Sequence, residues 1–570
     1  MSACRNQNAS NQVFALPEIV STISRYLDNK TRTVCLRVSK GWSSVWLPIL
    51  WHSIDAGWQW ADDAFLSALR RHGDLIRVLQ CGRYDDVRLL LNADTTSSPT
   101  CSNLSVLTLP KTTQVNQAAQ VQLLRQNPYL RDLALTIQDN PSSHYSDLFD
   151  AVGELRFLRR IAFHCNTSLE TSTLETVLSR CNGSLEELSL NDTYLIKHPF
   201  GSGAEFASGV LATPGTYENP SQDVVTEIKE AFKIQSLSIV RVACLQDLFL
   251  NLISRFPYLT GLSLAGSEEI YFEPDIAERL GRRCPKIRNL DISYREAMTD
   301  DEIASLIRSL PDLSILRATE TQLGDESMDA ILEKCGQLEE LSMTGTYNVE
   351  GHKIQELLQR SSQLKTLQSS DMELNIPRIM ADMYQQAASA GKPLAQHMEW
   401  ACRGIEVLDL RLDYDQCSLS EDERTVYSIV RARHFVYDQL SRLTKLRRLS
   451  ISAHLIVTTG LSDIEDDGDE EDGNVVDSLS TQQEKEDTAV DDDLWVDFSL
   501  RSGLATLAPL KNLRVLDVGD IHHAIGVPEV EWMCQNWPCL REISGLYEDS
   551  CEEARAWLCQ HKPGIEIGDE

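Results

Sequence analysis

The segment LEELSL, residues 185–190, places apolar side chains at its first, fourth and sixth positions. The same pattern returns in LTGLSL at 259–264 and in IRNLDI at 287–292. Wherever neighbouring copies follow one another without interruption, their spacing is 25 to 28 residues. Because so narrow a spacing indicates an internal repeat, each copy is predicted to form one short strand of a repetitive fold. The fifteen copies begin at Ile76, Leu104, Leu130, Leu158, Leu185, Ile234, Leu259, Ile287, Leu313, Leu338, Leu364, Ile405, Leu446, Leu513 and Leu540.

A helical pattern fills the space between many of these strands. Ile303, Leu306, Ile307 and Leu310 have the spacing of one helix face, and a proline such as Pro311 often follows and ends the helix. A strand and a helix of this size can bury their apolar faces only against neighbouring repeats, which is the logic of a solenoid. We therefore predict an α/β fold with parallel strands on the concave face and helices on the convex face.

These repeats resemble the cysteine-containing subtype of leucine-rich repeats. Cys101, Cys284, Cys335 and Cys402 occupy the helix-end position of that subtype. The resemblance implies a leucine-rich-repeat solenoid of about 15 repeats over residues 73–560. Long intervals near 191–233, 370–404 and 411–445 interrupt it, as insertions or as degenerate repeats.

A further interval contains an acidic tract. Residues 463–497 hold sixteen acidic side chains against the single Lys485. Such composition predicts a disordered insertion over residues 455–497. The functional alternative is a flap that repels acidic competitors or binds a basic partner.

The N-terminal segments LPEIVSTISRYL (16–27), CLRVSKGW (35–42) and LPILW (47–51) predict a small three-helix unit within residues 12–56. We expect a first helix over 16–27, a turn at Asp28-Asn29, a second helix carrying Val34, Val38, Trp42 and Val45, and a third element opening at Pro48. Residues 57–72 are expected to form a linker or cap. So small a unit cannot enclose its neighbouring tryptophans, which are Trp42, Trp46, Trp51, Trp58 and Trp60.

These segments resemble the F-box. The resemblance implies binding to a Skp-family adaptor and, through it, to a cullin scaffold, so that the chain would be the substrate-recognition subunit of an SCF-type ubiquitin ligase. The adaptor-binding residues that it implies are Leu16, Pro17, Ile19, Ile23, Leu27, Val38, Trp42 and Trp51. Three alternatives remain: these residues only cap the solenoid, the chain is a repeat scaffold without a link to ubiquitin, or it is an enzyme or GTPase-activating repeat protein.

The repeat pattern also predicts which side chains face a protein substrate, because its third and fifth positions point away from the core. Small residues prevail there and can simply suit a crowded surface. At the fifth position, charge appears only in the middle and later copies, and there the candidate substrate-binding set is Asp291, Arg317, Glu340, Asp409, Arg411 and Arg448.

Composition excludes several other functions. The formal net charge of −32 argues against a nucleic-acid partner, because such affinity comes largely from Lys and Arg. No apolar run is long enough for a membrane span, and the N-terminus lacks a signal-peptide pattern, so we expect a cytoplasmic and/or nuclear protein with reduced thiols. No phosphate-binding loop or zinc-spaced set appears, and the pair His522-His523 is expected in a surface loop. We predict no enzymatic activity, no cofactor and no metal.

Overall fold

The structure is a computed structural model that forms two compact units. Unit 1 comprises residues 1–291 with 309–312, and unit 2 comprises residues 292–308 with 313–570. The residues that the structure describes are 17–56, 63–81, 101–109, 117–137, 145–165, 168–181, 183–196, 231–244, 246–346, 349–376, 378–381, 399–413, 429–453, 496–519, 521, 523–547 and 551–568.

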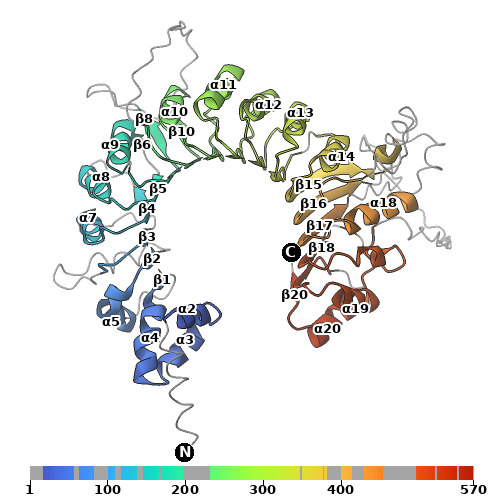
Figure 1. Cartoon of the computed structure of the whole chain (residues 1–570), viewed down its shortest axis with the longest axis horizontal. Coiled ribbons are helices and arrows are strands. Elements are labelled where there is room, and N and C mark those ends of the chain that lie inside the picture. Colours follow the sequence, from blue (N-terminus) through green and yellow to red (C-terminus); the bar gives the residue numbers. More distant parts are fainter. Residues whose placement is uncertain are drawn as a thin grey trace, which may run out of the picture. The chain divides into compact units, whose positions relative to one another are not determined.

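Unit 1 contains a parallel sheet to which each repeat contributes one strand (Figure 1). The pairing follows chain order through β1 (Ser53–Ala56), β2 (Val78–Cys81), β3 (Val106–Thr108), β4 (Asp132–Ile137), β5 (Arg160–Cys165), β7 (Glu187–Asn191), β9 (Ser236–Val240), β11 (Gly261–Ser263) and β12 (Asn289–Asp291). All but β1 start within the predicted six-residue pattern, so the strand prediction is confirmed for this unit.

The helices of unit 1 lie on the outer side of its sheet (Figure 1). They are α5 (Asp63–His72), α7 (Gln117–Gln126), α8 (Ser146–Gly153), α9 (Thr171–Cys181), α10 (Gln246–Ile253) and α11 (Pro274–Arg283), with a short 3-10 turn η1 (Gly73–Leu75). A second, smaller parallel sheet was not predicted, and it joins β6 (Ser168–Glu170), β8 (Tyr194–Ile196) and β10 (Ala243–Cys244).

The register of the strands explains the repeat. Leu107 pairs with Leu133, and Leu262 pairs with Leu290, so the fourth position of each pattern aligns with that of its neighbour. These leucines are at most 2% exposed and form a continuous column between sheet and helices. Burial of a Leu side chain contributes about 1.5–3 kcal/mol, and repeating it in every unit gives the array its core.

Unit 2 repeats this architecture. Its parallel strands pair in chain order through β13 (Ile315–Arg317), β14 (Glu340–Ser342), β15 (Thr366–Asn375), β16 (Val407–Asp413), β17 (Arg448–Ala453), β18 (Val515–Asp517), β19 (Glu542–Ser544) and β20 (Glu566–Gly568). Its helical segments are α12 (Asp300–Ser309), α13 (Asp325–Lys334), α14 (Gly351–Arg360), α18 (Ile429–Ser441), η2 (Leu504–Leu507), α19 (Val527–Asn536) and α20 (Glu552–His561).

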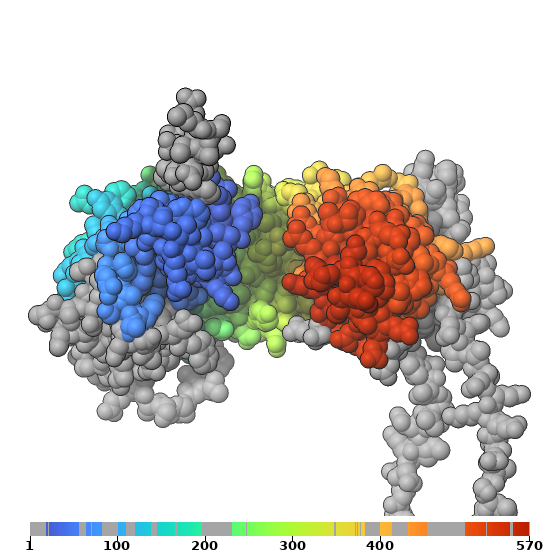
Figure 2. Space-filling view, turned by 90° about the horizontal axis from the view of Figure 1, so that it is seen from below, coloured from blue at the N-terminus to red at the C-terminus, as the bar shows by residue number. Residues whose placement is uncertain are grey.

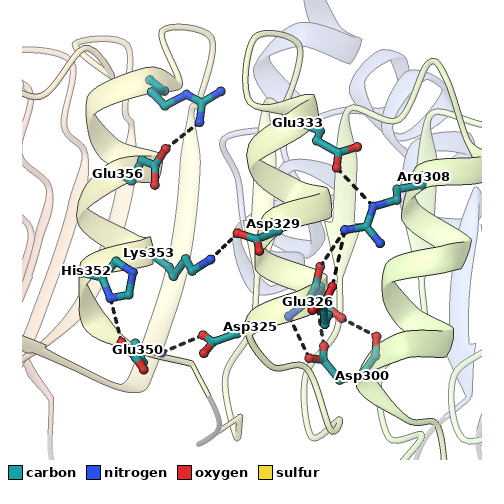
Figure 3. Close-up of polar contacts among 12 residues, drawn as sticks. Asp300, Arg308, Asp325, Glu326, Asp329, Glu333, Glu350, His352, Lys353 and Glu356 are labelled. Carbon is teal, nitrogen blue, oxygen red and sulfur yellow. Dashed lines mark hydrogen bonds and ion pairs between the residues drawn. The ribbon is translucent and has the colours of Figure 1, made fainter.

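Polar side chains join neighbouring helices of unit 2 on their outer side (Figure 3). Arg308 of α12 reaches Glu333 of α13, with 3.2 Å between Nε and Oε1. Lys353 of α14 forms an ion pair with Asp329 of α13. Charged contacts therefore link these neighbouring helices in addition to their apolar packing.

The long intervals separate strands that pair directly with each other. β7 pairs directly with β9, β15 with β16, β16 with β17, and β17 with β18. Each pairing spans one interval, and residues 197–230, 382–398 and 414–428 of these intervals lie outside the described residues. Residues 454–495, which hold most of the acidic tract, lie outside the described residues, whereas Val496 and Phe498 at its end are at most 3% exposed.

The N-terminal residues form three helices, α2 (Pro17–Ser24), α3 (Asn29–Leu36) and α4 (Lys40–Trp51). Their boundaries correct the prediction. The second helix ends at Leu36, because Ser39 then caps a new helix by accepting a hydrogen bond from the Trp42 amide at 3.1 Å. Pro48 lies inside α4 instead of opening a separate element.

Candidate functional site

Helix α2 has one face toward the chain and one toward solvent. Val20 is 0% and Ser24 6% exposed, whereas Ile19 is 36% exposed. Ile23 and Leu27 are half-buried. Of the predicted adaptor-binding residues in this segment, Leu16 lies outside the described residues and Pro17 is the first residue of α2.

The turn between α2 and α3 is held by polar contacts. Asp28 Oδ1 accepts a hydrogen bond from the Thr31 amide at 2.7 Å, and hydrogen bonding from Thr31 lowers the pKa of the Asp28 carboxyl. Arg32 Nη2 donates to the Ser24 carbonyl at 2.6 Å and so satisfies an acceptor at the end of α2. Together these bonds set the position of α3 against α2.

Helix α3 contains no buried residue. Val34 in this helix and Val38 just after it are each 59% exposed, and Tyr26 before it is 85% exposed. We call Ile19, Tyr26, Val34 and Val38 the exposed apolar set. The adaptor-binding prediction included Ile19 and Val38 but missed Tyr26 and Val34, although both belong to the apolar pattern of the segment.

The tryptophans of α4 differ in their surroundings. Trp42 is half-buried and stacks on Trp46, with 6.2 Å between ring centroids. Trp46 is 2% exposed and Trp51 only 9%. Trp51 stacks on Phe65 of α5 at 6.1 Å. Trp51 therefore packs α4 against α5 of the same chain, and its role in adaptor binding stays a prediction. Trp58 and Trp60 lie outside the described residues.

Figure 2 shows the N-terminal helical group in blue, with its outer surface turned toward the viewer. This group has a small core of its own, formed by side chains such as Val20 and Trp46. Its exposed apolar set is additional to that core. The arrangement suits binding of another protein by helices, in which apolar anchors are buried in the partner's groove.

The strand face holds the second candidate site. In unit 1, Asp291 accepts a hydrogen bond from Ser263 Oγ of the neighbouring strand at 3.0 Å. In unit 2, Arg317 Nη2 lies 2.7 Å from Glu340 Oε1. Arg317 and Glu340 thus neutralise each other across adjacent strands, and the pair cross-links β13 to β14.

The remaining predicted substrate-binding residues lie on β16 and β17. Asp409 pairs in register with Ser450, and Arg411 with Ser452. Arg448 is exposed at the start of β17, whereas Asp409 and Arg411 are half-buried. The structure therefore brings these three residues onto two adjacent strands of unit 2.

No catalytic constellation emerges among the described residues. They contain no group of three or more potential metal ligands, and none of their helices is long and apolar enough to cross a membrane. His523, expected in a surface loop, is 5% exposed, and its Nε2 lies 2.9 Å from the Gly545 carbonyl. Its Nδ1 lies 3.7 Å from the buried Cys551 thiol, so this His–Cys contact is out of reach of a substrate. His522 lies outside the described residues.

Comparisons with known proteins found no matching family model and no matching curated protein. Among solved structures, the chain is similar to an internalin of Listeria monocytogenes, at 14% identity over 51% of this chain and 78% of that chain, with a TM-score of 0.26. It is also similar to the Rad7 and Elc1 complex of yeast, at 11% identity over 100% of this chain and 97% of that chain, with a TM-score of 0.35. At these identities neither likeness bears on function.

Proposed function

We propose that this protein is the substrate-recognition subunit of an SCF-type ubiquitin ligase. In this proposal α2, α3 and α4 bind a Skp-family adaptor, which connects the chain to a cullin scaffold, and the repeats bind a protein substrate. The chain itself performs no catalysis and acts in the cytoplasm, the nucleus or both. Its contribution is to hold the substrate near a ubiquitin-loaded enzyme, because proximity alone raises a reaction rate greatly.

The observation that carries the proposal is the absence of a buried face on α3. A helix of eight residues is marginal by itself and normally gains its stability from packing an apolar face. Here Val34 remains 59% exposed in the free chain. Covering such residues with a partner removes apolar surface from water at about 25 cal/mol per Å². The sequence resemblance to the F-box names the partner that fits.

The test is capture of a Skp-family adaptor by the full chain carrying both Val34→Asp and Val38→Asp. Both side chains are exposed, so the fold should persist while two buried charges would oppose the complex. We expect capture to be lost. The matched control is Tyr271→Asp with Tyr294→Asp, which places the same two charges at residues that are 52% and 60% exposed outside the helical group. The control should capture the adaptor as the unchanged chain does, and circular dichroism should show equal helix content in both variants.

Equal capture by the double variant and the unchanged chain would contradict the adaptor role and leave the alternative of a repeat scaffold with no link to ubiquitin. Deleting the first 55 residues would not separate these possibilities. That deletion also removes most of β1, which pairs with β2 along its whole length from Ser53 to Ala56, and so exposes the edge of the unit 1 sheet. Point substitutions avoid this damage.

A further inference from the structure

Unit 1 exposes aromatic side chains where the chain enters its strands. Each repeat has one residue immediately before and one immediately after the first apolar residue of its pattern. We call these positions, in the repeats of β4, β5, β7, β9, β11 and β12, the strand-entry edge. Tyr129, Phe157 and Tyr258 lie on this edge and are 66%, 52% and 49% exposed.

Cations share this edge with the aromatic residues. The edge positions hold one acidic residue, Glu186, and the cations Arg131, Arg159, Lys233, Lys286 and Arg288. The Arg159 amide donates to the Arg131 carbonyl at 2.7 Å, and the Glu186 amide donates to the Arg159 carbonyl at 2.8 Å. The edge is therefore one continuous line of neighbouring backbone, with excess positive charge in a chain whose net charge is −32.

The side chains on this edge also meet one another. The rings of Tyr129 and Phe157 lie 5.5 Å apart, and Lys286 Nζ lies 5.3 Å from the centre of the Tyr258 ring. Between these two pairs lies a pocket of about 340 Å³. Its lining includes Phe157 and Leu185, the cations Arg131, Arg159 and Lys233, and the acidic Glu186. Arg159 Nη1 lies 3.9 Å from Glu186 Oε1, and both side chains are about half exposed. This ion pair is therefore weak and neutralises little of the positive charge on the edge.

Unit 2 has cations but no aromatic residues at the equivalent positions. Lys445, Arg447, Arg514 and Arg541 occupy them in the repeats of β17, β18 and β19, and no Phe, Tyr or Trp does so in any repeat of that unit. The combination of cation and aromatic ring is thus a property of unit 1. The repeat pattern does not explain this combination, because it requires only that the residues at these positions be exposed.

We propose that the strand-entry edge of unit 1 binds an acidic peptide segment of a partner protein, with an aromatic or large apolar side chain of that segment in the pocket beside Phe157. Carboxylates match the cations in charge, and Arg binds carboxylates with two hydrogen bonds. Ring contacts on Phe157 add apolar burial. The chain's large negative charge disfavours a nucleic acid, whose affinity depends on a broad positive field.

The geometry sets the length of the peptide. Six strands span about five intervals of 4.8 Å, or about 24 Å. An extended chain of about seven or eight residues covers this distance. A suitable probe is therefore a fluorescein-labelled peptide of about eight residues, composed of Asp and Glu around one central Phe. The proposal is independent of adaptor binding, because it involves neither α2, α3 nor α4.

The experiment measures fluorescence anisotropy of this probe with the full chain. We expect saturable binding that weakens as salt is added. Arg131→Ala with Arg159→Ala should raise the dissociation constant about tenfold or more, and Lys233→Glu should do so independently. The matched control, Arg514→Ala with Arg541→Ala, removes the same charge from unit 2 and should change it by less than about twofold.

A second readout tests the pocket. Replacing the central Phe of the probe by Ala should weaken binding to the unchanged chain, and Phe157→Ala should abolish this difference. If the unit 1 and unit 2 double variants lost the same affinity for the probe, binding would depend on charge attraction alone, and the proposal would be overturned. Tighter binding of an oligothymidylate than of the peptide, or no binding of the peptide, would overturn it as well.

Discussion

At the scale of single residues, Asp300 shows how one repeat stabilises the next. Its carboxylate accepts hydrogen bonds from three backbone amides at the start of α13, namely Gly324 at 2.8 Å, Glu326 at 2.9 Å and Ser327 at 3.0 Å (Figure 3). The N-terminal amides of a helix need such acceptors, and Gly324 supplies no side chain of its own. Asp300→Ala should lower the free energy of unfolding of this region by about 1–2 kcal/mol.

The measurement is native-state hydrogen exchange, which reports on the amides of α13 directly. Asp301→Ala is the matched control. Asp300 and Asp301 both lie in the first turn of α12, and Asp301 is exposed. It should change local stability by no more than about 0.5 kcal/mol. Equal protection of α13 in both variants would show that water satisfies these amides as well as Asp300 does.

The cysteines give a second prediction at the residue scale. Burial raises the pKa of Cys101 and Cys165 to about 11 and that of Cys284 and Cys402 to about 12. A thiol reacts as the thiolate. With these raised pKa values, only about one thousandth or less of each buried thiol is ionised near pH 8. Cys539 and Cys559 are exposed.

Iodoacetamide followed by mass spectrometry of the folded chain checks this difference. Near pH 8, Cys539 and Cys559 should be alkylated while the four buried thiols stay unmodified, and labelling of the buried thiols should rise with pH toward their pKa values. The control is the denatured chain, in which all six of these cysteines should be alkylated. Rapid labelling of Cys284 in the folded chain at neutral pH would contradict its buried position.

At the scale of elements, the sequence predicted the strands better than the N-terminal helices. A strand of the repeat is fixed by a period that fifteen copies confirm, so one misleading residue changes little. The break between α3 and α4 depends on a single cap, Ser39, and the spacing of Val34, Val38 and Trp42 continues across it by coincidence. The Asp300 cap has no local signature at all, because its acceptor and donor lie 24 residues apart.

At the scale of the whole molecule, the repeats were predictable and their ends were not. β1 and β20 pair with β2 and β19, yet neither contains the six-residue pattern. In the described residues each of these strands pairs with a neighbour on one side only, so packing against adjacent repeats fixes fewer of its side chains. The exposed apolar set was predictable as a pattern, whereas the burial of Trp51 depends on Phe65, which no local spacing reveals.

The C-terminal closing segment tests this view of the ends. Residues 551–570 contribute β20 to the edge of β19, and they bury Ala554 and Leu558 completely. Removing them should leave β19 with unpaired backbone groups and α19 with uncovered apolar surface, which are conditions for edge-to-edge association. We expect the truncated chain to form oligomers or aggregates, measured by size-exclusion chromatography with light scattering.

The control for this truncation removes only Asp569 and Glu570, which follow β20, and should leave the elution of the chain unchanged. The substitution Leu558→Asp separates the two causes, because it disturbs helix packing while β20 remains available to cover β19. Association of the truncated chain but not of the Leu558→Asp chain would assign the effect to the open strand edge. If the truncated chain kept the elution of the full chain, β19 would have to be protected by its own side chains, and the closing role of β20 would be rejected.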